Sequence, residues 1–383
     1  MRIINAKLFP MSGPVLERGY IDFDKKITGI GEMADMPFSD DPVLDACGAS
    51  VYPGFIDAHT HLGMWEDALG FEGDDGNEDT DPVTPQLRGI DAVNPTDKCF
   101  TEALEAGVTT VLTGPGSANP VAGQILAMKT MGRRVDDMVL CAPAAIKFAL
   151  GENPKTVYHG KSQAPVTRMA TAALIREMLA KAQKYRAAIV RAQCDEDAEE
   201  PEFDAKCDAL LPLIEGKIPA HFHAHRNDDI FTAIRIAKEF GLRYIIVHGT
   251  EGYTAADLLA AEGAPILCGP LLVDRGKPEM AALTPAAPGI LQKAGVPIAI
   301  VTDHSVVPIQ YLPLCAGLAA AEGLERMEAL KAITIYPARI CGIDRCVGSL
   351  EAGKDADMVL FDGDPLSLGA KPRAVFCNGK RVK

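Results

Sequence analysis

The chain has 383 residues, of which 48% are hydrophobic and 23% are charged, and it carries a formal net charge of −14. A chain of this length can bury a large core, since a single barrel domain takes about 250 residues. The negative charge argues against nucleic acid or an anionic membrane as a partner, because both are polyanions.

The cysteines and the N-terminus point to a reducing compartment. Ten cysteines are scattered along the chain without a Cys-x-x-Cys pair, and the first residues lack the apolar core of a signal peptide. We therefore expect reduced thiols and a cytoplasmic location.

Both ends of the chain predict short strands. Residues 1–50 contain strand-like runs broken by proline and glycine, and residues 347–383 repeat the pattern, with Asn378-Gly379 as a turn signal. The expected strands are Arg2–Phe9, Tyr20–Asp24, Lys26–Ile30, Met358–Phe361 and Ala374–Cys377. Neither end can bury a core alone. We therefore expect residues 1–50 and 347–383 to pair in one composite β-domain.

The first strand after this region ends in two histidines. An apolar run from Val51 leads into His59-Thr-His61. Residues i and i+2 of a strand point to the same face, so both imidazoles can reach one ion. Neutral imidazole is the commonest ligand of zinc-like ions in proteins. The pair alone is weak support for a metal site, because core histidines that are hydrogen-bonded to the backbone give the same sequence pattern.

Strands and helices alternate through the middle of the chain. The segment from Asn227 to Gly241 predicts an amphipathic helix, and Tyr244–His248, Ala264–Cys268 and Pro297–Thr302 predict strands. A strand spacing of roughly 25 residues is typical of parallel βα units. We therefore predict that residues 51–346 form a distorted (β/α)8 barrel, which places the fold in the α/β class.

Further histidines and one aspartate lie near the ends of these strands. His221, His223 and His225 share one strand face, His248 ends its strand, and Asp303 follows the last strand. In a (β/α)8 barrel the chemistry lies at the C-terminal ends of the strands. The pattern therefore predicts that ligands from several strands meet at one site.

These motifs together resemble the amidohydrolase superfamily, in particular its imidazolonepropionase-related and prolidase-like branch. The matching strings are Pro53–His61, His223-Ala-His225-Arg226, Val247-His248-Gly249, Thr302-Asp303-His304 and the closing Val347–Leu360. The resemblance covers nearly the whole chain. It implies a distorted barrel with a small β-sandwich built from both termini, and a metal-dependent hydrolase.

The resemblance also implies roles for five residues. His59 and His61 are expected to bind the more buried of one or two zinc-like ions. Asp303 is expected to bind the metal and to take a proton from the attacking water. His223 corresponds to the ligand on the fifth strand. His248 binds a second metal in some members and polarises the substrate carbonyl in others.

The bridge between two metals has two candidates. Family members use a carboxylated lysine or a glutamate, and the segment Ala144–Pro154 offers Lys147 and Glu152. Lys147 lies in an apolar strand, where an unpaired ammonium is costly. We favour Lys147 as the metal ligand and keep Glu152 as the alternative, with Lys129 a more distant choice.

Three residues near the strand-five motif have secondary roles. His225 and Arg226 are expected to contact the substrate, Arg226 by binding a carboxylate. A surface ion pair is the alternative for Arg226. We expect His221 to be a packed core residue. The acidic loop Glu66–Asp81 is either a solvated loop or a lid over the site.

We therefore expect an enzyme that hydrolyses a carbon–nitrogen bond, in an amide, a cyclic amide or a small peptide-like compound. One alternative is a deaminase of the same fold, although the positions where deaminases usually carry glutamate hold His225 and Arg226. The other is a catalytically silent relative without metal. We expect a small-molecule substrate and neither nucleic acid nor membrane as a partner, and we leave a homo-oligomer open.

Overall fold

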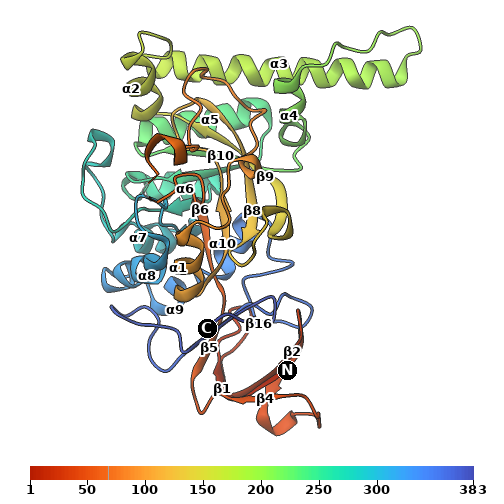
Figure 1. The fold of residues 1–383 in the computed structure, drawn as a ribbon. Helices are drawn as coiled ribbons and strands as arrows, with labels where there is room; N and C mark the ends of the chain where they lie inside the picture. The colour runs from red at the N-terminus through yellow and green to blue at the C-terminus, as the bar shows by residue number, and fades with distance from the viewer. Residues whose placement is uncertain (68) are drawn as a thin grey trace.

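The computed structural model describes residues 1–67 and 69–383. A barrel with surrounding helices forms the upper and middle part of the molecule, and a second sheet forms the lower part, where both chain termini lie (Figure 1). In the part of the chain that is described, no helix is both long and apolar enough to cross a membrane.

Strands from both ends of the chain form the lower sheet. Its strand order is β16-β15-β14-β5-β1-β2-β3, with β4 paired to β1. The strands are β1 Arg2–Leu8, β2 Leu16–Phe23, β3 Ile27–Glu32, β4 Val43–Asp45, β5 Ser50–Pro53, β14 Met358–Phe361, β15 Ala374–Cys377 and β16 Lys380–Arg381. Phe23 and Phe376 pack edge to face in its core, with ring centroids 5.3 Å apart. Hydrogen bonds join all these strands in one sheet, so the two-layered sandwich is not confirmed, and the domain boundaries stay a prediction.

The second sheet is a nearly closed barrel of eight strands. Its order is β13-β12-β11-β10-β9-β8-β7-β6. The strands are β6 Phe55–Thr60, β7 Val108–Thr113, β8 Val121–Lys129, β9 Val139–Ala149, β10 Ala220–Ala224, β11 Tyr244–His248, β12 Ile266–Cys268 and β13 Ile298–Ile300. The α/β barrel that the sequence predicts is thus confirmed.

One barrel strand runs against the others. β8 pairs antiparallel with both β7 and β9, whereas the remaining barrel pairs are parallel. No α-helix is described between β7 and β8 or between β8 and β9, so strand-helix alternation fails here. Antiparallel neighbours need only a short connection, whereas parallel neighbours need a crossover.

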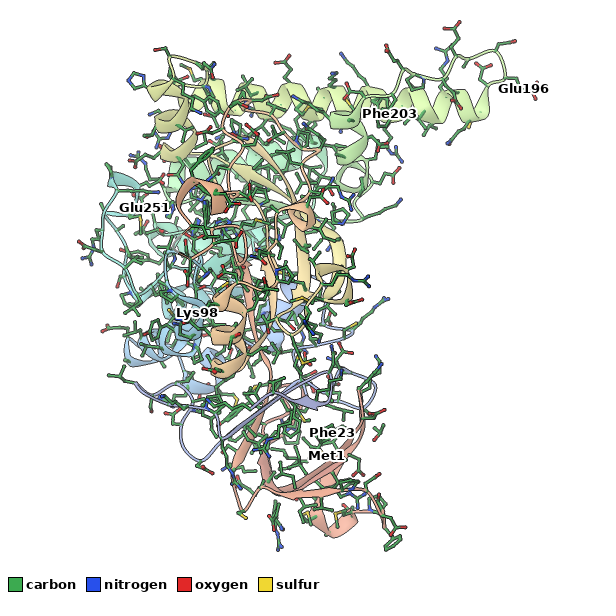
Figure 2. The ribbon with its side chains drawn as sticks, in the orientation of Figure 1. Met1, Phe23, Lys98, Glu196, Phe203 and Glu251 are labelled. Atoms are coloured by element: carbon green, nitrogen blue, oxygen red, sulfur yellow. The ribbon has the colours of Figure 1, made fainter. Side chains whose placement is uncertain are left out.

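Ten α-helices are described. They are α1 Lys98–Ala106, α2 Glu152–Gly160, α3 Arg168–Cys194, α4 Ala205–Ile214, α5 Asn227–Phe240, α6 Ala256–Glu262, α7 Ala287–Lys293, α8 Leu312–Ala321, α9 Arg326–Lys331 and α10 Ile335–Ile340. Gly241 ends α5 with a φ of +66°, as the sequence predicts. α3 runs across the top, and its far end projects from the barrel beside Glu196 and the exposed Phe203 (Figures 1 and 2).

A buried ion cluster ties the barrel to the lower sheet. Lys129 ends the reversed strand β8, so it lies at the opposite end of the barrel from His59 and His61. Its Nζ lies 2.5 Å from Asp357 and 2.9 Å from Asp355. These three side chains are largely buried. Lys129 is therefore a structural ion-pair partner and takes no part in the predicted metal site.

We predict that Lys129→Met destabilises the fold by about 3–5 kcal/mol, because it leaves two buried carboxylates without their cation. Urea unfolding followed by circular dichroism measures the change. Lys98→Met is the matched control, since the Lys98 side chain is 73% exposed and pairs with the partly exposed Glu102 one helical turn away. An equal loss of stability in both variants would contradict the structural role of the cluster.

Candidate active site and metal centre

Six side chains that could ligate a metal ion gather at the C-terminal end of the parallel barrel strands. They form two groups, in each of which the possible ligand atoms lie within 4.8 Å of one another. The first group is His59, His61 and Asp303, and the second is His223, His225 and His248. The rings of His59 and His248 connect the groups, with centroids 5.4 Å apart.

In the first group, two imidazoles face one carboxylate. The Nε2 atoms of His59 and His61 each lie 3.3 Å from Oδ1 of Asp303. Nδ1 of His61 lies 2.7 Å from the carbonyl oxygen of Gly114, which can only accept, so Nδ1 carries the proton. Nε2 of the neutral ring is then a lone-pair donor. His59 Nε2 is buried and has no hydrogen-bond partner among the residues described, as expected of a group that binds an ion.

The protonation states suit metal binding. Burial and the charge of Lys147 lower the pKa of His59 to about 3, so its ring is neutral at neutral pH. Burial raises the pKa of Asp303, but the neighbouring imidazoles of His248, His59 and His61 outweigh this effect and hold that pKa well below its usual range. The first group therefore offers the neutral ring of His59 and the Nε2 atom of His61 beside a charged carboxylate, which is a donor set that zinc-like ions accept.

In the second group, the Nδ1 atom of each imidazole is tied to a neighbour. Nδ1 of His248 donates to the carbonyl of Gly269 at 2.7 Å. Nδ1 of His225 and of His223 lie 2.6 Å and 2.9 Å from the hydroxyls of Thr250 and Ser117. Such partners fix the ring orientation of metal-binding histidines. His225, which the sequence predicts to contact the substrate, thus lies within ligand distance of His223 and His248.

Lys147 is close enough to both groups to influence a histidine of each. It is on β9 in register with His221, and it is completely buried. Its Nζ donates to the carbonyl of Pro115 at 3.3 Å. Burial is the main cause of the lowered pKa of His59 and of His223, one from each group, and the charge of Lys147 contributes to both. Burial lowers the pKa of Lys147 itself to about 8, so the uncharged amine that carboxylation requires is accessible near neutral pH.

The remaining residues singled out in the sequence lie around this centre. His221 is buried below it, and neither of its ring nitrogens has a hydrogen-bond partner in the described part of the chain. Glu152 opens α2 and lines the cavity, but its Oε2 accepts a hydrogen bond from the backbone of Glu279. Arg226 pairs through two nitrogens with Asp228 and lines a neighbouring cavity.

Sequence reasoning missed Asp57 in the strand-one motif. Burial raises the pKa of Asp57 to about 7. Its carboxyl accepts hydrogen bonds from the backbone and hydroxyl of Thr302 and from the backbone of His59. Asp57 therefore fixes the first strand against the end of the last one. The sequence signal for this role is an acidic residue inside an apolar run, two positions before the candidate ligand His59.

Two ligands have an unusual backbone conformation. His248 has a φ of +73° and Asp303 a φ of +56°, in the left-handed region that non-glycine residues rarely adopt. Such conformations cost about 1–3 kcal/mol and persist where the surrounding structure imposes them. Here they turn the side chains at the strand ends towards the centre.

A cavity of about 380 Å³ opens above the two ligand groups. His61, His223, His225 and Asp303 lie at its floor, while Asn153 and Lys277 line its wall. Nζ of Lys277 donates to Oδ1 of Asn153 at 2.8 Å. Apart from the histidines, Lys277 is the single basic residue among the described residues that line this cavity.

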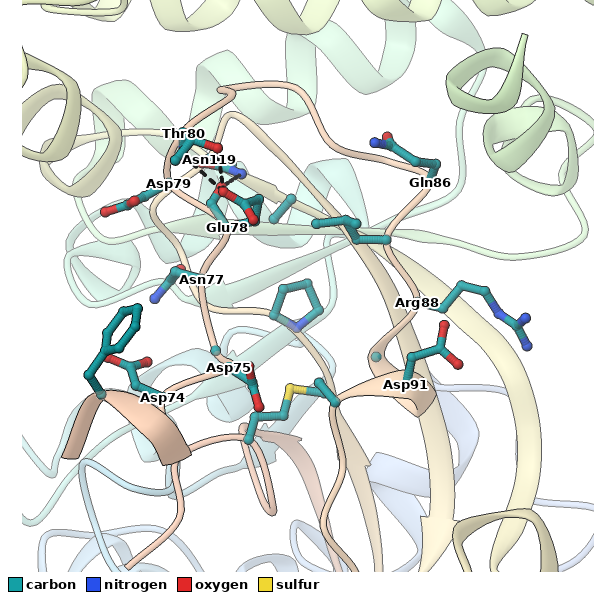
Figure 3. A pocket seen from close by; sticks show the side chains of 18 residues that line it. Asp74, Asp75, Asn77, Glu78, Asp79, Thr80, Gln86, Arg88, Asp91 and Asn119 are labelled. Carbon is teal, nitrogen blue, oxygen red and sulfur yellow. Dashed lines mark hydrogen bonds between the residues drawn. The ribbon is translucent and has the colours of Figure 1, made fainter. Parts of the chain in front are cut away.

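The acidic loop after β6 lies beside this cavity. Trp65, just before the loop, packs edge to face on His61 with ring centroids 4.7 Å apart. Oδ1 of Asn77 accepts a hydrogen bond from the backbone of Ala118 at 3.1 Å. Figure 3 shows the adjoining cavity of about 590 Å³, into which this loop brings Asp74, Asp75, Glu78 and Asp79. Asn77 lines both cavities.

Comparison with known proteins gives consistent matches. Residues 50–382 match the Amidohydrolase family. The amidohydrolase tasK of Hapsidospora irregularis is 30% identical over 90% of this chain, which spans only 38% of that longer protein. An imidazolonepropionase of Maricaulis maris is 26% identical over 88% of this chain and 85% of its own length.

A crystal structure of an amidohydrolase from Thermotoga maritima has nearly the same fold. Its TM-score is 0.96 at 40% sequence identity, and the alignment covers 100% of this chain and 99% of the other. The resemblance that the sequence motifs suggest is thus confirmed by sequence and by structure. The chain belongs to the amidohydrolase family, whose members hydrolyse carbon–nitrogen bonds.

Proposed function

We propose that the protein hydrolyses a carbon–nitrogen bond of a small amide, cyclic amide or peptide-like compound with one or two zinc-like ions. The observation that carries this proposal is the pair of buried ligand groups beneath a cavity. A bound divalent ion acts as a Lewis acid and lowers the pKa of its water towards about 7. In the proposed centre, His59, His61 and Asp303 hold one ion, and His223, His225 and His248 hold the other.

Asp303 is the candidate for proton transfer. Its pKa lies well below its usual range, so its carboxylate is charged at neutral pH. It can therefore accept a proton from the attacking water and pass that proton to the leaving nitrogen.

The tautomer of His248 favours a role as ligand over a role as hydrogen-bond donor. Its Nδ1 carries the proton that Gly269 accepts, and burial holds the pKa of the ring well below its usual range. A neutral imidazole protonated at Nδ1 has only a lone pair at Nε2. Nε2 can therefore bind an ion but cannot donate a hydrogen bond to a substrate carbonyl. This supports the two-ion form of the proposal.

The cavity wall favours a substrate that carries a carboxylate. Lys277 provides a cation, and Asn77, Ser117 and Asn153 provide neutral polar groups at the same cavity. A hydrogen bond to a charged group contributes about 1.5–3 kcal/mol. Arg226, which the sequence suggested for this role, lines the neighbouring cavity and is already paired with Asp228.

A panel of small substrates tests the proposed function. The zinc-loaded protein should hydrolyse members of a set of N-acyl amino acids, dipeptides and cyclic amides. Free acids should react with a kcat/KM at least about tenfold higher than their methyl esters, because the ester cannot pair with Lys277. Amidine-containing bases are included, and release of ammonia from these alone would favour the deaminase alternative. A metal-loaded protein that turns over neither set would contradict both.

We predict that Asp303→Asn lowers kcat by about 10²–10⁴-fold, because the amide cannot accept the proton. Circular dichroism checks that the variant is folded. Asp362→Asn in the lower sheet is the matched control, since the Asp362 side chain is 70% exposed. Near-normal turnover by folded Asp303→Asn protein would assign the base to another residue.

We further propose that Lys147 is carboxylated and bridges the two ions. A buried ammonium between two dications would be repelled and desolvated, whereas a carbamate supplies two anionic oxygens. Lys147→Ala should lower the metal content from two ions per chain to one or none, as measured by elemental analysis. Short carboxylic acids should restore part of the activity. Electron density for an unmodified lysine in the two-metal protein would refute the bridge.

A further inference from the structure

A carboxylate outside the predicted ligand set points at the second histidine group. Glu279 lies in the short turn Pro278–Met280 after β12, and it is only 1% exposed. Its Oε1 lies 3.8 Å from Nε2 of His223 and 3.8 Å from Nε2 of His225. Within the described residues, this oxygen has no hydrogen-bond partner. One oxygen of the buried Glu279 carboxyl therefore points towards two imidazoles and has no hydrogen-bond partner among the described residues.

The other oxygen of Glu279 is held firmly. Oε2 accepts a hydrogen bond of 2.9 Å from the backbone of Glu152, and the Glu152 carboxyl accepts one of 3.3 Å from the backbone of Glu279. The chain can approach this closely because residue 151 is glycine. A Cβ atom on Gly151 would lie 2.8 Å from Oε2 of Glu279, and the φ of Gly151 is +83°. The surrounding chain thus fixes the direction of the free oxygen.

The buried carboxyl of Glu279 has no lysine or arginine partner among the described residues. Among the described residues, its only ion-pair contacts are with His223 and His225. Burying a charged carboxylate without a partner costs several kcal/mol. A divalent cation bound between these groups would offset that cost.

We infer that Glu279 is the fourth protein ligand of the ion at His223, His225 and His248. Tetrahedral zinc with bonds of about 2.0–2.2 Å places neighbouring ligand atoms about 3.4 Å apart. The distances of 3.8 Å require shifts of only a few tenths of an ångström. The inference rests on the proposed metal-dependent function and adds one ligand to it, because three imidazoles and a carboxylate give this ion four protein ligands before any bridge from Lys147 is counted.

This assignment separates the roles of the two ions. Metal sites with four protein ligands are typically structural, whereas catalytic sites keep one position open for water. The group of His59, His61 and Asp303 has three ligands, so it has one protein ligand fewer than the Glu279 site, whether or not Lys147 bridges the two ions. The Glu279 site then serves to hold the strand ends and to add positive charge beneath the substrate cavity.

The test measures metal binding directly, without a substrate. Metal-free wild-type protein and Glu279→Gln are titrated with Zn²⁺ by calorimetry, and the bound ions are counted by elemental analysis. Glutamine keeps the shape and can still accept from the Glu152 backbone, but it lacks the charge. We expect two ions in the wild type, with the affinity for one of them weakened at least about tenfold in the variant. Glu322→Gln, at an exposed position, is the matched control.

A second measurement needs no variant. In a crystal structure of the zinc-loaded wild-type protein, Oε1 of Glu279 should lie about 2.0–2.2 Å from an ion. A two-ion structure with Glu279 out of bonding range, or equal affinities in Glu279→Gln and wild type, would overturn this inference and leave the proposed function intact. Wild-type protein that binds no ion would overturn both.

Discussion

The contact that closes the barrel holds the site together. Strand β6 meets the chain after β13 through hydrogen bonds from the backbone of Asp303 to the carbonyl of His59 and from the backbone of His61 to that of His304. The buried carboxyl of Asp57 reinforces this contact by accepting from Thr302. The first and last strands of the barrel thereby bring two imidazoles and one carboxylate within ligand distance of each other. Without this closure the first ligand group would not exist.

The second constraint is that polar ligands are buried and must be oriented. The imidazoles of His61 and His248 are held by backbone carbonyls, and those of His223 and His225 lie against hydroxyls. Because a carbonyl oxygen can only accept, each hydrogen bond to a carbonyl also decides which ring nitrogen is free to bind an ion. The arrangement supports a preorganised centre in which little has to move when an ion enters.

The reversed direction of β8 places its last residue at the opposite end of the barrel from the candidate metal site. Its last residue, Lys129, lies away from the histidines and joins Asp355 and Asp357 near the lower sheet. The neighbouring strand β9 runs in the common direction and carries Lys147 into the centre. Two buried lysines on adjacent strands thus differ in role because their strands run in opposite directions. The one beside carboxylates is an ion-pair partner, and the one beside imidazoles faces the proposed metals.

The sequence by itself determined the family, the barrel and most of the ligand types. Strands such as Tyr244–His248 combine an apolar run with a terminal histidine, and that local pattern can be recognised from the sequence alone. Strand parity puts His223 and His225 on one face, so only the family resemblance ranked His223 as the ligand, and no local signal pointed to Glu279. That residue lies in a loop after β12, and only the backbone contact with Glu152 aims its carboxylate at the histidines. Tertiary structure decided these points because ligand geometry depends on contacts between segments far apart in the chain.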